Sequence, residues 1–308
     1  MKHLLKISDL TREEFDGLMS LTAKLKKEQK SGIEHHILKG KTLGMIFTKS
    51  STRTRVSFET GMYQLGGQAL FLSSNDIQLG RGETIYDTAN VLSSYIDGIM
   101  IRTFKQSDVE ELAQYGQIPV INGLTDDHHP CQVLADMFTI IEHKGSLDGL
   151  KMAYIGDGNN MANSLMEVCA LAGVDFSIAT PDGFACEQKY VDGAKAVAEK
   201  YGCKIDVSND PVRAIKDADV VYADTWVSMG QEEEKAARLK LFMPYQINKE
   251  LWSHANKDAI FMHCLPAYRG YEVTEDIIDS PCSVIFDEAE NRLHAQKAVM
   301  AATMGQML

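Results

Sequence analysis

Three hydroxyl side chains and two guanidinium groups stand within five residues, in the segment Ser51-Thr52-Arg53-Thr54-Arg55. The segment follows a short apolar run, residues 43–47, and leads into a stretch with Phe58, Met62 and Leu65 at helical spacing. A helix that starts directly after a strand offers unpaired backbone N–H groups and the positive end of its dipole to an anion. One arginine here would fit a plain helix cap with a solvated side chain, but two arginines among hydroxyls favour ligand binding. The segment therefore predicts a phosphate site.

This expected phosphate site differs from the glycine-rich kind. No Gly and no Lys occurs between Ser50 and Phe58, so the Walker A pattern is absent. Side chains, Arg53 foremost, must then supply the contacts that a glycine-rich backbone supplies elsewhere. We expect a small phosphorylated metabolite rather than a nucleoside triphosphate with magnesium, and neither a cofactor nor a metal.

Length and composition restrict the class of protein. At 308 residues the chain predicts two domains of about 100 to 200 residues each. Its formal net charge of -12 argues against a nucleic-acid partner, which needs a basic face. The six cysteines form no CxxC pair and show no zinc-like spacing, which is typical of a reduced cytoplasmic enzyme. No apolar signal core and no stretch of roughly 18 apolar residues occurs, so we expect a cytoplasmic location and no membrane partner.

Short apolar runs alternate with amphipathic, helix-period segments along most of the chain. The expected strands are residues 43–47, 98–101, 119–121, 152–155, 176–179, 204–207, 220–223, 260–262 and 284–286. The expected helices between them include residues 132–143, 163–171 and 191–201. This alternation is typical of βαβ units, so the predicted fold class is α/β with parallel sheets.

The domain boundary is best placed at residues 144–149, where a long expected helix ends and a new strand begins at Leu150. We expect two doubly wound parallel-sheet domains, residues 1–143 and 150–286, that face each other across a cleft. The last segment, residues 288–306, is predicted to be a helix that packs back on the first domain.

Polar residues follow most of the expected strands, where ligands of open α/β sheets bind. They are Ser51 to Arg55, Arg102, His129 with Gln132, Asp157 to Asn160, Asp224, and His263 with Cys264. Each has a structural explanation by itself: a surface arginine at 102, a helix cap at 129, a packed core thiol at 264. Their shared position at strand ends makes a common functional explanation the better one.

Four motifs along the chain carry a family resemblance. They are Ser-Thr-Arg-Thr-Arg at 51–55, His-Pro-Cys-Gln at 129–132, Asp-Thr-Trp-Val-Ser-Met-Gly at 224–230 and His-Cys-Leu-Pro at 263–266. With them the chain resembles the aspartate/ornithine carbamoyltransferase family over its whole length, including residues 76–80 and 288–292. The first two motifs mark carbamoyltransferases generally, and the last two indicate the ornithine-using members. The implied reaction is transfer of the carbamoyl group of carbamoyl phosphate to the δ-amine of L-ornithine, giving citrulline and phosphate.

The resemblance also implies roles for individual residues, which fall into a carbamoyl phosphate group and an ornithine group. The phosphate would be held by Ser51, Thr52, Arg53 and Thr54, and the carbamoyl group surrounded by Arg102, His129 and Gln132. The site would be closed around the reacting atoms by Cys264, the Leu265 carbonyl and Arg292, and completed by Gln78 from a neighbouring subunit of a homotrimer. The amino-acid end of ornithine would be bound by Asn160, Asp224, Ser228 and Met229. Arg55 receives no binding role, because its place one turn into the helix allows a structural ion pair.

The residue types fit this chemistry. Amine attack on a carbamoyl carbon builds negative charge on the carbonyl oxygen, which Arg102 and His129 can stabilise. Phosphate leaves as an anion held by Arg53 and can accept the amine proton, so no protein nucleophile is needed. Cys264 is expected to position the δ-amine, and Asp224 to supply the charge that the α-ammonium requires. The α-carboxylate would be bound by Asn160 and the Met229 amide.

Three alternatives have other sequence requirements. A carbamoyltransferase for putrescine or another amine would have little use for the Ser228-Met229-Gly230 loop. A nicotinamide-dependent dehydrogenase is suggested by Gly156-Asp157-Gly158, but Met161 stands at the third glycine position of GxGxxG. A catalytically inactive interaction subunit finds no support, because every expected polar position is occupied. The choice between arginine synthesis and citrulline breakdown stays open, as does assembly beyond a trimer.

Overall fold

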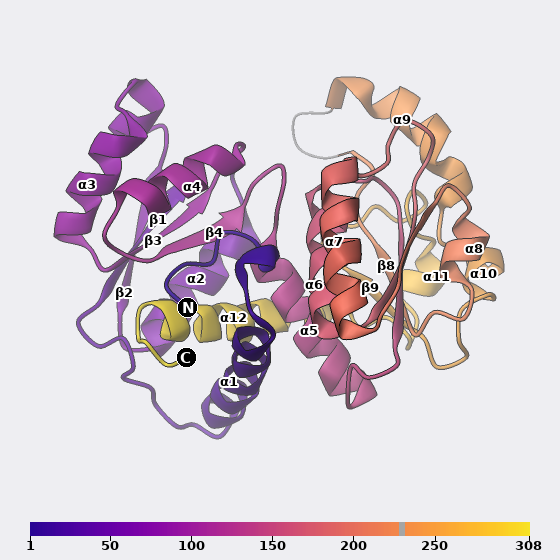
Figure 1. Cartoon of the computed structure of the whole chain (residues 1–308), viewed down its shortest axis with the longest axis horizontal. Helices are drawn as coiled ribbons and strands as arrows, with labels where there is room; N and C mark the ends of the chain where they lie inside the picture. Colours follow the sequence, from indigo (N-terminus) through magenta and orange to yellow (C-terminus); the bar gives the residue numbers. More distant parts are fainter. Residues whose placement is uncertain (228–231) are drawn as a thin grey trace. The chain divides into compact units, whose positions relative to one another are not determined.

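The computed structural model describes residues 1–227 and 232–308, which form two compact units, each built on a parallel β-sheet (Figure 1). The first unit comprises Met1–Phe138 and Glu290–Leu308, and the second unit comprises Thr139–Ala289. The predicted α/β class with two parallel sheets flanked by helices is therefore confirmed. Within the described residues, no helix is both long enough and apolar enough to cross a membrane.

The first unit contains a four-stranded sheet in the order β2-β1-β3-β4. Its strands are β1 (Thr42–Phe47), β2 (Gln68–Ser73), β3 (Gly98–Arg102) and β4 (Val120–Leu124). Its helices are α1 (Arg12–Lys30), α2 (Thr52–Gln64), α3 (Ile85–Tyr95) and α4 (Gln106–Tyr115), with the short 3-10 helices η1 (Ile7–Asp9) and η2 (Gln78–Arg81). Figure 1 shows α3 and α4 on one side of this sheet and α2 on the other. Buried contacts of Ile99 and Ile101 with Val109 and Leu112 fix β3, the strand that ends at Arg102.

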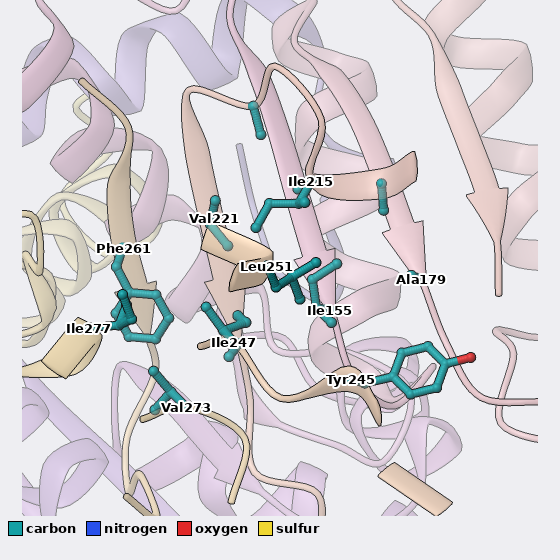
Figure 2. Close-up of a cluster of buried hydrophobic side chains, with 14 of the residues drawn as sticks. Ile155, Ala179, Ile215, Val221, Tyr245, Ile247, Leu251, Phe261, Val273 and Ile277 are labelled. Atoms are coloured by element: carbon teal, nitrogen blue, oxygen red, sulfur yellow. The ribbon is translucent and has the colours of Figure 1, made fainter. Parts of the chain in front are cut away.

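The second unit contains a five-stranded sheet in the order β7-β6-β5-β8-β9. Its strands are β5 (Lys151–Ile155), β6 (Asp175–Ala179), β7 (Ile205–Ser208), β8 (Val220–Ala223) and β9 (Ile260–His263). Its helices are α6 (Asn160–Ala172), α7 (Gln188–Tyr201), α8 (Pro211–Ile215), α9 (Lys235–Phe242), α10 (Lys249–Trp252) and α11 (Glu275–Ile278), with η3 (Glu232–Glu234) and η4 (Met243–Tyr245). Figure 2 shows the buried core in which Ile155 and Val221 of the sheet pack with Ile215 and Leu251. This core holds β5, β8 and β9, whose carboxyl ends carry polar residues.

Two long helices, α5 (Pro130–Lys144) and α12 (Ile285–Thr303), contribute residues to both units. Their parts in the second unit contact each other, since His143 Nε2 lies 2.9 Å from Asp287 Oδ2. Lys144, the last residue of α5, donates to Asp258 Oδ2 at 3.0 Å.

The expected strands at 43–47 and from 98–101 to 260–262 correspond to β1 and to β3 through β9. The expected strand at 284–286 is wrong. Val284 donates its N–H to the Phe261 carbonyl (3.0 Å), its own carbonyl accepts the N–H of Glu288 (2.9 Å), and α12 begins at Ile285. Acidic residues at 287 and 288 favour a helix N-terminus there, and three apolar residues cannot distinguish a strand from a first helical turn.

Two further differences are a strand that was not predicted and a helix with shifted ends. The sequence pattern does not predict β2, an edge strand whose residues are half-buried or exposed instead of forming an apolar stripe. The last helix covers Ile285–Thr303 instead of 288–306. It starts earlier because residues 285 and 286 belong to its first turn, and it ends shortly before Gly305, a residue type that disfavours helix.

Candidate active site

The phosphate segment lies where β1 passes into α2. Ser51 is the N-cap of α2, and its Oγ accepts the backbone N–H of Thr54 at 3.2 Å. Thr54 is buried, whereas Thr52 and Arg53 are exposed at the helix start. The first turn contains no acidic residue, so nothing in it opposes the positive end of the helix dipole. The local structure is suited to an anion.

The contacts of Arg55 indicate a structural role instead of phosphate binding. Its Nε donates to Glu59 Oε1 at 3.0 Å, and its guanidinium lies 3.7 Å from the centroid of the Phe71 ring. The ion pair that its helical position allowed is present. Arg55 therefore ties α2 to strand β2.

Arg102 stands next to the phosphate segment because β1 and β3 are adjacent. Phe47 and Arg102 are partners in the parallel register. The Arg102 carbonyl accepts the backbone N–H of Thr48 at 2.9 Å and its hydroxyl at 3.1 Å. The Arg102 residue is only 6% exposed, so its charge acts in a largely dry setting.

His129 is the residue before α5 and is buried. The preceding turn is closed by hydrogen bonds from Thr125 N to His128 O (2.8 Å) and from His128 N to Thr125 Oγ1 (3.0 Å). Burial lowers the pKa of His129 well below its usual value of 6.5, and the positive charges of Arg292, Arg102 and Arg53 lower it further. The imidazole is therefore neutral and surrounded by cations, which leaves it one N–H to donate to an acceptor.

Gln132 and Arg292 meet directly. Gln132 Nε2 donates to Asp136 Oδ1 at 2.8 Å, and Gln132 Oε1 accepts from Arg292 Nη1 at 2.5 Å. With the Gln296 amide turned so that its oxygen faces Arg292, this oxygen accepts from Arg292 Nη2 at 2.7 Å, and the amide nitrogen donates to Ser57 Oγ. Gln296 thereby orients Arg292, although no motif in the sequence marks it.

Gln78 is the first residue of η2, in the connection between β2 and α3. The residue is exposed, and within the described part of the chain its side chain makes no hydrogen bond.

In the second unit, Asp224 and Cys264 lie together at the ends of the adjacent strands β8 and β9. Cys264 Sγ donates to Asp224 Oδ1 at 3.1 Å. Asn159 Nδ2 donates to Asp224 Oδ2 at 2.8 Å, while Asn159 Oδ1 accepts the N–H groups of residues 161 and 162 and so caps α6. Asn159 therefore fixes the Asp224 carboxylate, a role that its residue type alone does not predict. The predicted ligand Asn160 is the next residue, the first of α6.

Leu265 directly follows Cys264. Its φ of 57° lies in the left-handed region, and the Leu265–Pro266 peptide bond is cis. The Leu265 N–H is donated to Nδ1 of His263 at 2.9 Å.

Asp157 follows β5 and contacts the buried guanidinium of Arg238. Arg238 Nε also donates to the Trp226 carbonyl at 2.6 Å, so Arg238 joins the ends of β5 and β8. Burial raises the pKa of Asp157 above its usual value of 3.8, and the Arg238 charge opposes this shift. Long-range pairing of this kind gave no signal in the sequence.

The predicted ornithine ligands Ser228 and Met229 lie outside the described residues. Within residues 1–227 and 232–308, no group of three or more His, Cys, Asp or Glu side chains could hold a metal ion. At Gly158, a residue of the Gly-Asp-Gly segment that suggested a dinucleotide, a Cβ atom would lie within 2.6 Å of three backbone atoms of residues 184–186, so close packing within the protein already accounts for this glycine.

Comparison with known proteins relates both parts of the chain to one family. The family model "Aspartate/ornithine carbamoyltransferase, carbamoyl-P binding domain" matches residues 2–142, and "Aspartate/ornithine carbamoyltransferase, Asp/Orn binding domain" matches residues 148–303. An ornithine carbamoyltransferase of Thermococcus kodakarensis is 56% identical over 304 residues, covering 99% of this chain and 96% of that protein. One of Bacillus subtilis is 56% identical over 303 residues, covering 98% and 94%. The solved structure of ornithine carbamoyltransferase from Pyrococcus furiosus is similar with a TM-score of 0.96 and 54% identity, covering 99% of this chain and 97% of that one.

Proposed function

Because the chain belongs to the aspartate/ornithine carbamoyltransferase family, we propose that it transfers the carbamoyl group of carbamoyl phosphate to the δ-amine of L-ornithine. Citrulline and phosphate are the products. The observation that carries this proposal is the pairing of Cys264 with Asp224, since a thiol and a carboxylate side by side suit a primary amine substrate.

Carbamoyl phosphate binds to the first unit in this proposal. The N-terminus of α2 receives the phosphate through Ser51, Thr52 and Thr54, and the Arg53 guanidinium adds a charge-assisted contact. This arrangement stabilises the phosphate as it leaves, so the leaving group needs no protonation by an acid.

The carbamoyl oxygen is bound by Arg102 and His129. Attack by the amine turns this oxygen into an oxyanion, and fixed donors in a dry setting stabilise it without reorganising. A neutral His129 can donate one hydrogen bond without placing a fourth positive charge among Arg53, Arg102 and Arg292. Gln132, fixed by Asp136 and Arg292, presents its amide to the carbamoyl group, and Arg292 binds the same substrate.

Ornithine binds to the second unit. Asp224 supplies negative charge for an ammonium group, and because its Oδ1 accepts from Cys264, the carboxylate also lies within reach of the amine that Cys264 positions. The Leu265 carbonyl is a further acceptor for that amine. We assign the α-carboxylate of ornithine to Asn160, Ser228 and Met229. The reacting δ-amine attacks as the neutral amine and loses its proton to a phosphate oxygen.

The test is a steady-state assay with carbamoyl phosphate against ornithine, putrescine and aspartate, with the ureido product measured by colour. Ornithine should have the highest kcat/KM. Putrescine lacks the α-carboxylate and leaves its donors unpaired, which costs on the order of 1 to 3 kcal/mol per group. A kcat/KM for putrescine equal to or above that for ornithine would overturn the assignment of the acceptor.

We also propose that the chain forms a homotrimer with shared sites. Strand β2 is an edge of its sheet, and its Leu70 and Phe71 are exposed in the single chain. An exposed apolar edge strand is a pairing hazard that contact with a second copy removes. Gln78 follows this strand and would complete the carbamoyl phosphate site of the neighbour.

The proposed location is the cytoplasm, where thiols stay reduced. All six cysteines are free, and four of them are buried. The product citrulline places the reaction in arginine metabolism.

A further inference from the structure

A histidine and a glutamate form a fully buried pair beside the proposed ornithine site. His263 is the last residue of β9, and Glu272 lies in the segment that follows. Their side chains are at most 1% exposed, and His263 Nε2 lies 3.2 Å from Glu272 Oε1. The proposed chemistry uses neither group directly, so the pair needs another explanation.

The hydrogen bonds of the pair determine which ring nitrogen of His263 carries the proton. Nδ1 accepts the backbone N–H of Leu265 at 2.9 Å, and a nitrogen that accepts cannot also be protonated. The proton is therefore on Nε2 and is donated to Glu272 Oε1. Glu272 selects the one tautomer of His263 that can receive the Leu265 N–H.

The chain at Leu265 needs such support. Leu265 has a φ of 57°, a backbone conformation in which Cβ is crowded and which leucine rarely adopts. Residues in this region persist where their surroundings hold them, and they gather at functional sites. Here the contact that holds Leu265 is the hydrogen bond from its N–H to the His263 ring. Cys264 lies between these two residues in the chain, so this bond also restrains Cys264.

Both carboxylates around His263 anchor more than one segment. Glu272 Oε1 also accepts the backbone N–H of Tyr268 at 2.5 Å, which ties down the chain after Pro266. On the other side, Glu288 Oε2 accepts the His263 backbone N–H at 2.8 Å, and Glu288 Oε1 accepts from the Tyr222 hydroxyl at 3.0 Å. The segment from His263 to Tyr268 is held at both ends by buried acids.

We propose that Glu272 and His263 are positioning residues for the amine acceptor, acting through the Leu265 N–H. They set the direction of the Cys264 thiol toward Asp224 and of the Leu265 carbonyl toward the amine, and they do not touch the substrate. This role rests on the proposed carbamoyl transfer to ornithine. Stability is a weaker explanation, since a buried polar pair contributes no more to folding than well-packed apolar residues would.

Two substitutions at His263 separate the two ring nitrogens. His263→Asn places an amide oxygen where Nδ1 lies and can still accept the Leu265 N–H. His263→Gln places its amide nitrogen where Nε2 lies and can still donate to Glu272, but it removes the Nδ1 acceptor of the Leu265 N–H. The proposal predicts that the Asn variant keeps most of the parent kcat with ornithine and that the Gln variant loses on the order of 10²-fold. His254→Asn, at an exposed histidine of the same unit, is the matched control.

A second readout follows the loop without using the reaction. In the parent, the carboxylate of Asp224 disfavours the thiolate of Cys264, which slows alkylation by iodoacetamide. Mass spectrometry gives the alkylation rate of Cys264, with the half-buried Cys282 as an internal reference in the same chain. Cys264 should be alkylated faster in His263→Gln and at the parent rate in His263→Asn. If carbamoyl transfer to ornithine itself were absent from the parent, this readout would still test the positioning role.

Glu272 supplies the decisive variant if either His263 variant fails to fold. Glu272→Gln keeps an amide oxygen for His263 Nε2 and the Tyr268 N–H, and Oε2 has no hydrogen bond to lose among the described residues. It should therefore keep the parent kcat and Cys264 alkylation rate, while Glu272→Ala should lose both. Equal kcat and equal alkylation rates in His263→Asn and His263→Gln, or loss of both properties in a folded Glu272→Gln, would overturn the proposal.

Discussion

Cys264 donates a hydrogen bond of 3.1 Å from its thiol to Oδ1 of Asp224, the oxygen that also accepts the backbone N–H of Thr225. A thiol that donates to a carboxylate is protonated, and the nearby negative charge disfavours the thiolate that nucleophilic attack requires. The geometry supports a thiol that orients the amine and does not support a covalent carbamoyl-cysteine.

The first prediction follows from this contact. Cys264→Ser replaces the thiol with a hydroxyl that can donate to the same carboxylate, so we expect reduced but measurable carbamoyl transfer. Steady-state rates and mass spectrometry of the quenched enzyme are the measurements. Complete loss of activity in a folded variant, or trapping of a carbamoylated Cys264 in the parent, contradicts the positioning role.

The second prediction concerns the phosphate segment. Arg53→Ala should lower kcat/KM by on the order of 10² to 10³, because it removes a charge-assisted donor to the leaving group. Since Arg53 is exposed in the described chain, the melting temperature should not change. Arg55→Ala is the matched control, because Arg55 binds Glu59 and Phe71 and should keep most of the activity. A stable Arg53→Ala enzyme that keeps more than about a tenth of the parent rate would rule out the phosphate role.

The third prediction tests the shared site of the trimer. Gln78→Ala and Arg53→Ala chains are each expected to be impaired. The two kinds of chain are dissociated reversibly and mixed in equal amounts. A Gln78→Ala chain supplies its own Arg53, and an Arg53→Ala neighbour supplies Gln78, so about a quarter of the sites contain both residues. Activity should then rise well above either parent variant. Verified hybrids that show only the average of the two variants would place Gln78 in the site of its own chain.

The fourth prediction concerns stability at acidic pH. His294 on α12 is buried, and burial lowers its pKa from 6.5 to about 4, although its contact with Glu290 opposes this shift. Between these pH values the unfolded chain binds a proton that the folded chain does not bind. The stability that neutral His294 provides above pH 6.5 is therefore lost as the pH falls toward 4, by at most about 1.4 kcal/mol per pH unit.

The measurement for this fourth prediction is the free energy of unfolding by urea between pH 7.5 and pH 4.5. His294→Asn should show a smaller loss of stability toward acidic pH than the parent. His36→Asn removes a histidine whose side chain is 67% exposed and should follow the parent. Equal slopes for the parent and His294→Asn would show that His294 does not couple protonation to folding.

Much of the fold could be predicted from the sequence because the central strands are apolar throughout. Strands β5 and β8 are almost fully buried, and each appears in the sequence as a short apolar run between helical patterns. Strand β2 could not be predicted in this way, since an edge strand with exposed residues lacks that pattern. The prediction of a strand at 284–286 was wrong for the opposite reason, because the apolar residues there belong to the start of a helix.

The proposed site could be predicted from the sequence where the residue type itself indicates the chemistry, as for the anion-binding arginines Arg53 and Arg102 near His129. The supporting residues were not predictable. Asn159 reaches Asp224 and Glu272 reaches His263 through contacts that folding creates. Gln296 lies one turn after Arg292 on α12, and its amide also bonds Ser57 of α2, a contact that folding creates as well. Common side chains of this kind carry no local signal, and their roles depend on which segments lie side by side.

The parallel order of both sheets has a consequence for how fast the chain folds. Every strand pair described in them joins segments separated by a helix, so no pair can form as a local hairpin. Closing such long loops costs entropy before any strand contact compensates for it, which slows folding and leaves apolar strands such as β5 exposed to other chains meanwhile. Synthesis at low temperature, where aggregation of such intermediates is slower, should therefore give a larger yield of native protein.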